Sequence, residues 1–235
     1  MPNSKNDITI IFLTINRVPK EWAAFHKKVL LDAAGDHPII TVSREPTDIG
    51  TNIIDAEPMC ASNIYFQLLR AAKLATTPFI GQAEDDTLYN REHFNCFRPE
   101  MDTFAYNISR WSLYTWGVPT FSWRHSPAGA SLIAPRKKFI EVLEERFKRF
   151  PGVIPTEFCS ELGFRTFEQQ HGWKQEKYIE FYSVDPIIQV NHDYFSFQNT
   201  GAEAVAKRHK KRMGFMRAFD IPYWNKAEDL VKKFK

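Results

Sequence analysis

The sequence predicts an α/β protein whose central sheet is mostly parallel and flanked by helices, with a basic helical segment near the C-terminus. Two observations favour this class. Nearly continuous apolar, β-branched runs such as "ITIIFLTI" (8–15) are typical of strands buried on both faces of a parallel sheet. Over the first 90 residues, such runs alternate with segments whose apolar residues recur at helical spacing.

The expected elements follow from these patterns in chain order. In the first half we expect strands at 8–15, 39–43 and 78–82, a helix between 16 and 35 that ends at Gly35, and a helix after the N-cap Ser62. In the second half we expect strands within 104–116, at 132–134 and within 178–195, helices after 135, at 155–172 and within 201–219, with Thr156 and Gly172 bounding the second of these.

Composition sets the broad class of the protein. The 235 residues are 43% hydrophobic and 14% aromatic, which suits one large domain with a sizeable core. No apolar stretch has the length of a membrane span, and the polar start "MPNSKND" lacks the core of a signal peptide. The three cysteines are widely spaced, as expected of free thiols in a reducing compartment. We therefore expect a cytoplasmic protein, in the host cytoplasm if the source is viral.

Three consecutive acids, Glu84, Asp85 and Asp86, directly follow the apolar strand expected at 78–82. In α/β sheets, ligands bind at the carboxyl ends of the strands. In an extended segment the first and third acids point the same way, so Glu84 and Asp86 could share a divalent cation such as Mn²⁺ or Mg²⁺. A solvated cluster of loop acids is the alternative.

This pattern resembles the nucleotide-sugar glycosyltransferases of GT-A fold, of the family 2 type. The stretch "NIYFQLLRAAKLATTPFIGQAEDDTLY" is similar to their unit of helix, strand and acid-x-acid motif, except that the first acid here is Glu84. The resemblance covers roughly 8–195. It implies a single domain over 1–235, with a nucleotide-binding half (1–100), an acceptor and catalytic half (101–195) and a basic helical tail (196–235).

The resemblance also implies which residues bind the donor and the metal. Asp86 would be a direct metal ligand together with Glu84, with Asp85 as the alternative second acid, and His192, in "QVNHDYF", would be a further ligand that favours Mn²⁺. The donor, expected to be a uridine diphosphate sugar, would meet the ends of the first strands and the helix that follows. The donor-binding candidates are Thr14, Asn16, Arg17, Ser43, Arg44, Asn63, Gln67 and Asp85. Capping and ordinary surface polarity are the alternatives for Asn63 and Gln67.

A catalytic base is the remaining requirement of such a transfer. Inverting members carry an acidic motif at the start of a late helix, and "PTEFCSELGFR" is similar, with Glu157 and Glu161 four residues apart on the predicted helix. We expect Glu157 to be the base and Glu161 to be the second candidate. The turn "HSPAGAS" (125–131) resembles the small-residue turn that lines the donor sugar and the acceptor.

The acceptor is predicted less directly. Five cations within six residues favour a polyanionic acceptor such as DNA with hydroxymethylated bases, which some phage glycosyltransferases modify: Lys207, Arg208, Lys210, Lys211 and Arg212. A surface polysaccharide, a lipid-linked glycan or a solvated basic helix are the alternatives. A nucleotidyltransferase or a metal-dependent phosphohydrolase is the competing class of enzyme, and a non-catalytic binding module is a third reading. The sequence contains no P-loop and no G-x-G-x-x-G motif.

Overall fold

A computed structural model describes residues 6–115, 119–123, 125–164, 167–192 and 216–234. Its larger sheet has seven strands in the order β10-β6-β9-β4-β1-β2-β3. All neighbouring strands in this sheet are parallel except at β9, which runs antiparallel to both β4 and β6. The mixed, mostly parallel sheet confirms the predicted α/β class. Its strands are β1 (Ile8–Leu13), β2 (Ile39–Ser43), β3 (Thr51–Ile54), β4 (Phe79–Glu84), β6 (Thr103–Asn107), β9 (Leu132–Pro135) and β10 (Lys177–Phe181).

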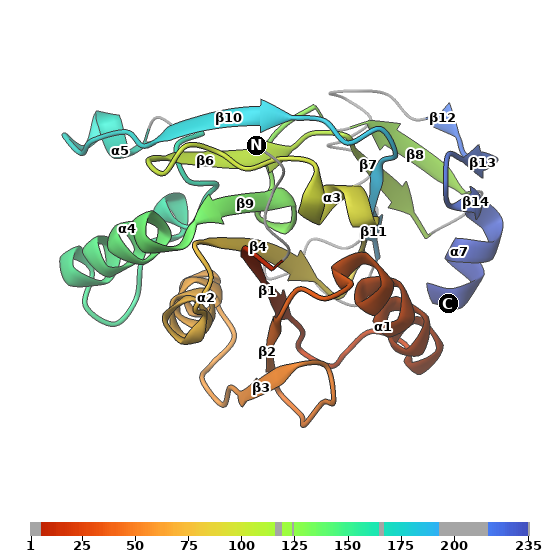
Figure 1. Ribbon diagram of the computed structural model, residues 1–235, viewed down its shortest axis with the longest axis horizontal. Coiled ribbons are helices and arrows are strands. Elements are labelled where there is room, and N and C mark those ends of the chain that lie inside the picture. Colours follow the sequence, from red (N-terminus) through yellow and green to blue (C-terminus); the bar gives the residue numbers. More distant parts are fainter. Residues whose placement is uncertain (1–5, 116–118, 124, 165–166, 193–215, 235) are drawn as a thin grey trace.

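Helices cover both faces of this sheet (Figure 1). On one face, Ile11 and Leu13 of β1 pack into a core cluster with residues of α2 and α4, and the alternate residues Ile10 and Phe12 pack into another with residues of α1 and α3. Burial on both faces is why β1 reads as an unbroken apolar run. The helices are α1 (Lys20–Ala34), α2 (Ala61–Leu74), α3 (Arg91–Asn95) and α4 (Arg136–Arg149).

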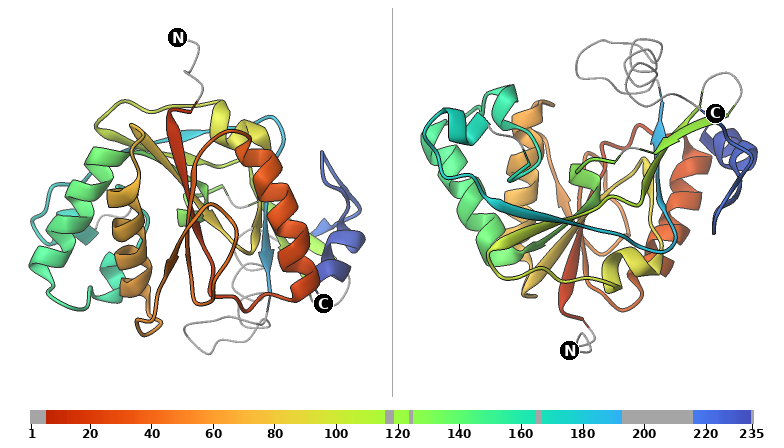
Figure 2. Two further views of the ribbon diagram at one scale, coloured as in Figure 1. Left: turned by 60° about the horizontal axis from the view of Figure 1, so that its bottom comes forward. Right: turned by 90° about the horizontal axis from the view of Figure 1, so that it is seen from above.

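A second sheet of five strands, in the order β12-β8-β7-β11-β5, lies beside the first. It packs against α1 and the C-terminal helix through a third cluster, in which Trp22, Leu113 and Phe234 are buried. Figure 2 shows β10 crossing from the side of α4 and α5 towards β11. The elements are β5 (Thr87–Leu88), β7 (Arg110–Tyr114), β8 (Thr120–Trp123), β11 (Ile187–Asn191), β12 (Met216–Arg217), the hairpin β13 (Asp220–Ile221) and β14 (Asn225–Lys226), α5 (Phe167–Gln170) and α7 (Ala227–Phe234).

The structure corrects one predicted helix and the end of another. In its described part, the segment 155–172 contains only a 3₁₀ turn at Thr156–Phe158 and the short α5, and the positive φ of Gly163 interrupts a continuous helix. An added Cβ at Gly163 would lie 2.6 Å from the carbonyl oxygen of Glu176, so the chain passes too close there for a larger residue. Of the helix expected within 201–219, only the last four residues are described, and Met216–Arg217 is a strand.

The N-cap of α2 also differs from the prediction. Cys60 caps this helix, and its Sγ accepts a hydrogen bond from the backbone N–H of Asn63. Ser62 lies in the first turn instead, where its hydroxyl accepts a hydrogen bond from the backbone N–H of Ile154 at 2.9 Å. Ser62 therefore ties the loop that follows α4 to the start of α2. No helix among the described residues has the length and apolarity needed to cross a membrane.

Candidate active site

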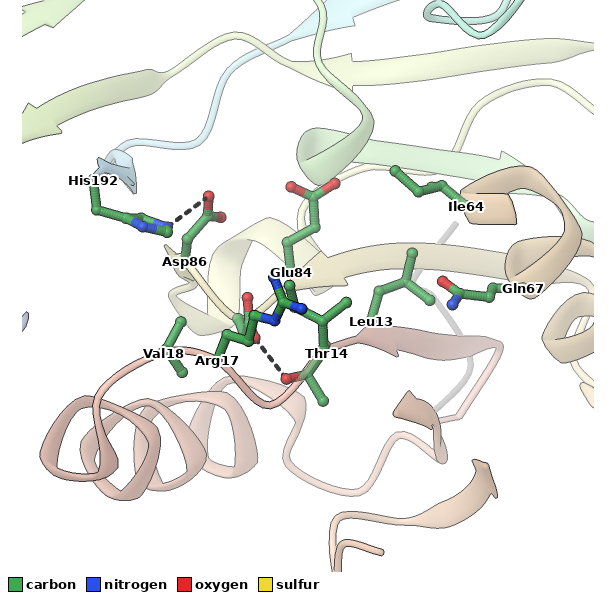
Figure 3. Close-up of a pocket in the computed structure, with 11 residues that line it drawn as sticks. Leu13, Thr14, Arg17, Val18, Ile64, Gln67, Glu84, Asp86 and His192 are labelled. Atoms are coloured by element: carbon green, nitrogen blue, oxygen red, sulfur yellow. Dashed lines mark hydrogen bonds and ion pairs between the residues drawn. The ribbon is translucent and has the colours of Figure 1, made fainter. Parts of the chain in front are cut away.

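The three acids lie where β4 ends, beside the end of β1. Glu84 is the last residue of β4 and pairs with Leu13 of β1. The side chain of Asp85 turns towards β1, where its Oδ2 accepts a 2.5 Å hydrogen bond from the hydroxyl of Thr14. Figure 3 shows the carboxylates of Glu84 and Asp86 pointing to the same side. This alternation agrees with the predicted geometry of an extended acidic segment.

Burial makes the ionised forms of these acids costly. Burial raises the pKa of Asp85 to about 7, although the hydrogen bond from Thr14 opposes the shift. Burial also raises the pKa of Glu84, and the neighbouring charges of Asp86 and Asp85 raise it further. The pKa of Asp86 rises for the same first reason, while the charge of Arg110 holds it down. Fully ionised acids at this position therefore need a compensating cation.

Arg110, at the start of β7, supplies part of that compensation from the protein. It is 1% exposed, and its guanidinium donates hydrogen bonds to Oε1 of Gln189 and, at 3.2 Å, to the carbonyl oxygen of Ser126. Its charge lowers the pKa of both Glu84 and Asp86. This role was not predicted from the sequence, because Arg110 lies in a segment rich in aromatic residues, far from the acids in the chain.

His192 meets Asp86 at the end of β11. Its Nε2 lies 3.9 Å from Oδ2 of Asp86, and their side chains are 9% and 23% exposed. Within the described residues, no three His, Cys, Asp or Glu side chains are arranged so that they could hold a metal ion by themselves. The predicted trio of Glu84, Asp86 and His192 is thus not a ready-made ligand set. An imidazole and a carboxylate side by side do fit a cation that takes its other ligands from phosphate oxygens and water.

A cavity of about 160 Å³ opens in front of the acids. Of the donor-binding candidates, it brings together Thr14, Arg17, Gln67 and Asp85 (Figure 3). The polar lining of the cavity includes the guanidinium of Arg17 and the three carboxylates, while leucine, isoleucine and valine side chains supply an apolar part of the lining. The lining residues are Leu13, Thr14, Ile15, Arg17, Val18, Ile64, Gln67, Glu84, Asp85, Asp86 and His192.

Three other donor-binding candidates, which do not line this cavity, have structural partners. Asn16 has a φ of 57°, and its Oδ1 accepts hydrogen bonds from the backbone N–H groups of Arg44 and Glu45 at 2.8 and 3.0 Å. The hydroxyl of Ser43 donates to the carbonyl oxygen of Glu45 at 2.7 Å. The guanidinium of Arg44 donates to the carbonyl oxygen of Asp55 at 2.9 Å. These side chains fix the loops after β1 and β2.

Asp55, directly after β3, organises the side of α2 that the sequence assigned to the donor. Its side chain is fully buried, and its Oδ2 accepts hydrogen bonds from Asn63 at 2.8 Å and from Gln67 at 2.7 Å. Arg70 donates to the other carboxylate oxygen at 3.0 Å. Asn63 and Gln67 therefore share one helix face as predicted, but their amides bind Asp55. Sequence reasoning missed Asp55 because these partners lie up to 15 residues away from it.

A second cavity of about 220 Å³ adjoins the first, and both are lined by Glu84 and Ile64. Its far wall contains Glu161, whereas the exposed Glu157 lines neither cavity. The two glutamates do not share a helix face, because the predicted helix is absent. Glu161 is therefore the better placed of the two candidate bases. The remaining lining residues include Ala61, Tyr65, Leu68, Gln82, Tyr106, Gly129, Leu132, Phe139, Cys159, Ser160 and Leu162.

Three side chains hold the irregular segment that carries Glu161. The hydroxyl of Tyr65 donates a 2.5 Å hydrogen bond to the carbonyl oxygen of Ser160, and that of Tyr106 donates to Leu162 at 3.0 Å. The buried guanidinium of Arg146 donates to the carbonyl oxygen of Phe158 and pairs with Glu168. Carbonyls on both sides of Glu161 are thus fixed by α2, β6 and α4. These side-chain donors replace the backbone hydrogen bonds of the predicted helix.

The small-residue turn approaches the acids through Gly129. A Cβ at this position would lie 3.1 Å from Nε2 of Gln82, and that same nitrogen donates a 2.9 Å hydrogen bond to Oε1 of Glu84. The close approach explains a glycine here. Gly129 also lines the second cavity. The basic cluster at 207–212 and Arg165 lie outside the described residues.

No family model and no curated protein sequence matches the chain. Among solved structures, the chain is similar to a mannosyltransferase from Pyrobaculum calidifontis in complex with GDP-Man and Mn²⁺, at 14% identity and a TM-score of 0.46 over 81% of this chain and 58% of that one. It is also similar to a glycosyltransferase involved in glycosylation of the major capsid of PBCV-1, at 10% identity and a TM-score of 0.45 over 86% of this chain and 98% of that one. The chain is similar as well to a nucleotidyl transferase from Methanothermobacter, at 12% identity and a TM-score of 0.44 over 77% of this chain and 89% of that one. Likenesses this distant do not bear on the activity of the chain.

Proposed function

We propose that the protein is a metal-dependent glycosyltransferase that moves a sugar from a nucleotide diphosphate sugar to an acceptor hydroxyl. The observation that supports this most is the meeting of two cavities at Glu84: the first is also lined by Asp86 and His192, and the second by Glu161. A donor whose diphosphate lies beside Asp86 and His192 can place its sugar towards Glu84. The acceptor then enters through the second cavity.

The chain's own residues have distinct roles in this reaction. Asp86 and His192 would hold Mn²⁺ or Mg²⁺, which neutralises the charge that develops on the leaving diphosphate. Arg17, which lines the same cavity, adds positive charge on the diphosphate side. Glu161 takes the proton of the acceptor hydroxyl as its oxygen bonds to the anomeric carbon. The bond between that carbon and the diphosphate oxygen breaks, and the nucleoside diphosphate leaves with the electron pair.

Glu84 has a different role from that of a direct ligand. Its Oε1 accepts a hydrogen bond from Gln82, next to Gly129, so its carboxylate faces the junction of the two cavities. There it can hold a hydroxyl of the transferred sugar. Asp85, bound to Thr14, orients the backbone between the other two acids. The DNA acceptor predicted from 207–212 stays a prediction, since those residues lie outside the described ones.

Thermal unfolding of the full chain with nucleotide sugars tests this proposal. We expect UDP-sugars to raise the melting temperature only when Mn²⁺ is present, because a ligand that binds the native state stabilises it by mass action. Asp86→Asn should abolish the shift. Asp48→Asn is the matched control, since Asp48 is 79% exposed and pairs with Lys27 on the surface.

The competing class of enzyme gives a different result in the same experiment. A nucleotidyltransferase binds a nucleoside triphosphate and releases pyrophosphate, so its melting temperature should respond to triphosphates and not to nucleotide sugars. If neither nucleotide sugars nor triphosphates shift the melting temperature, with or without Mn²⁺, the donor site is refuted. Equal shifts in wild type and in Asp86→Asn would refute the role of this acid.

A further inference from the structure

An exposed aromatic corner lies near the end of β10, outside both cavities. It consists of Trp123 at the end of β8, His125 in the following loop, and Tyr182 just after β10. Trp123 and Tyr182 are 45% and 57% exposed, and His125 is also exposed. The His125 ring contacts both Trp123 and Tyr182, so the three exposed rings form one surface patch.

The rings form a floor and a wall. Nε2 of His125 and the hydroxyl of Tyr182 are 2.8 Å apart, and the two ring planes differ by only 26°. The hydrogen bond joins a ring nitrogen of His125 to the hydroxyl at the tip of Tyr182. The two rings therefore lie edge to edge and form a nearly flat surface, called the floor of the corner. The Trp123 ring meets His125 at 70° with centroids 5.1 Å apart, and its Nε1 is fixed by a 2.9 Å hydrogen bond to the carbonyl oxygen of Ile108.

The chemistry of this corner suits a sugar ring. A pyranose has an apolar face of C–H groups that can lie on aromatic rings, and a rim of hydroxyls that needs hydrogen-bonding partners. The Tyr182 hydroxyl can both donate and accept, so it keeps capacity for a partner besides His125. Acidic residues flank the floor: Glu180 is exposed two residues before Tyr182, and Glu92 accepts a hydrogen bond from the backbone N–H of Val184 at 2.7 Å. These two carboxylates would oppose a phosphate backbone on the Tyr182 side of the corner, which favours a neutral glycan there.

The corner is close to the second cavity along the chain. His125 and Gly129 are four residues apart, which limits the separation of their Cα atoms to about 14 Å. Gly129 lines the second cavity and contacts Gln82, the partner of Glu84. A short oligosaccharide can span this separation with one end at the acids and another ring on the corner.

We propose that the corner of Trp123, His125 and Tyr182 is a distal subsite that binds a neutral glycan acceptor by stacking of one of its sugar rings. This inference rests on the proposed glycosyltransferase function and names the acceptor class for that site. The proposed acceptor is therefore a glycan and not DNA. A glycan was one of the alternatives that the sequence left open.

Binding to immobilised glycans tests the subsite without relying on activity. The probes are neutral oligosaccharides of one to six sugar units, with a single-stranded oligodeoxynucleotide containing 5-hydroxymethylcytosine for comparison. We expect the full chain to be retained by at least one glycan of three or more units. Trp123→Ala and Tyr182→Ala should weaken this binding by about tenfold each. Phe219→Ala is the matched control. Phe219 is another exposed aromatic residue, 64% exposed, and it follows β12, the edge strand of the second sheet.

Each outcome of this experiment decides a separate point. Retention by no glycan, or retention that both corner variants leave unchanged, would overturn the subsite. Retention by the oligodeoxynucleotide that the corner variants weaken would assign the rings to base stacking and also overturn it. Trp123→Phe and a melting curve for each variant show whether a loss reflects the ring or a failure to fold. The Mn²⁺-dependent thermal shift with UDP-sugars is measured on the same variants and should be unchanged, so failure of the donor site is seen separately.

Discussion

The hydroxyl of Thr14 donates a 2.5 Å hydrogen bond to Oδ2 of Asp85, and so joins the ends of two adjacent strands across 71 residues of chain. Asp85 also receives, at its carbonyl oxygen, a 2.7 Å hydrogen bond from Nε1 of Trp22 in α1. With both contacts in place, Asp85 is turned away from Asp86. The central residue of the acidic segment thereby orients its two neighbours towards the cavities.

Thr14→Val tests this orienting contact. The variant keeps the shape of the side chain but removes the donor, so the pKa of Asp85 should rise further, because the hydrogen bond from Thr14 lowers it. We expect the unfolding free energy at about pH 8 to fall by about 1–2 kcal/mol, with weaker Mn²⁺-dependent donor binding. Thr14→Ser, which retains the hydroxyl, is the control. Urea unfolding and donor titration that match wild type for Thr14→Val would show that the contact is dispensable.

The raised pKa of Asp85 predicts a pH dependence of stability in the metal-free protein. Its pKa rises from 3.8 to about 7 on folding, chiefly by burial. A raised carboxyl pKa means that the folded state favours the protonated form, so this contribution to stability is complete below about pH 4 and is lost as pH rises through about 7. Asp85→Asn is neutral throughout and can still accept from Thr14.

The stability difference between Asp85→Asn and wild type should therefore grow with pH. In the presence of EDTA, we expect the variant to gain about 3–4 kcal/mol relative to wild type between about pH 4 and pH 8. Urea unfolding at both pH values measures the change. A difference that stays constant over this range would contradict the burial of an ionised Asp85.

Glu161→Gln and Glu157→Gln separate the two candidate bases. Glu161 lines the second cavity and Glu157 lines neither, so Glu161→Gln should lower kcat by about 10²–10⁴-fold and leave donor binding intact. Glu157→Gln should retain wild-type activity. Transfer is measured as release of the nucleoside diphosphate in the presence of the acceptor. The reverse pattern, with activity lost only in Glu157→Gln, would return the role of base to the residue that the sequence favoured.

Tyr106→Phe tests the support of the segment that carries Glu161. The variant keeps the buried ring but leaves the carbonyl oxygen of Leu162 without the 3.0 Å hydrogen bond. An unsatisfied buried carbonyl costs about 1–3 kcal/mol, so we expect the unfolding free energy to fall by this amount. The value of kcat should fall while the KM for the donor stays near wild type. A lower stability with an unchanged kcat would limit Tyr106 to a structural role.

The first half of the fold could be predicted because its apolar runs are long and buried on both faces. β1 and β2 satisfy this condition, and both were placed correctly. β3 was missed because Thr51–Ile54 is a short edge strand with its end residues exposed. The order of strands in the sheet, and the antiparallel β9, depend on pairings between distant segments that periodicity does not encode.

The site was predicted where the signal was local and missed where it was not. The acids at the end of β4 carry their own signal, and the structure places the predicted residues Thr14, Arg17 and His192 at the same cavity. Glu157 and Glu161 were expected on one face of a helix at 155–172. Tertiary hydrogen bonds from Tyr65, Tyr106 and Arg146 hold that segment in an irregular form instead.

The central claim is that Asp86, His192 and the diphosphate of the donor hold the metal jointly. Electron paramagnetic resonance of Mn²⁺ measures this directly, because the signal of the free aqueous ion falls when the ion is bound. Since the two side chains alone are an incomplete ligand set, we predict weak binding of Mn²⁺ to the full chain and strong binding once UDP is added, beyond that of UDP without protein. Asp86→Asn and His192→Gln should each remove this UDP-dependent binding. Strong binding of Mn²⁺ without UDP, or UDP-dependent binding that survives both substitutions, would contradict the account.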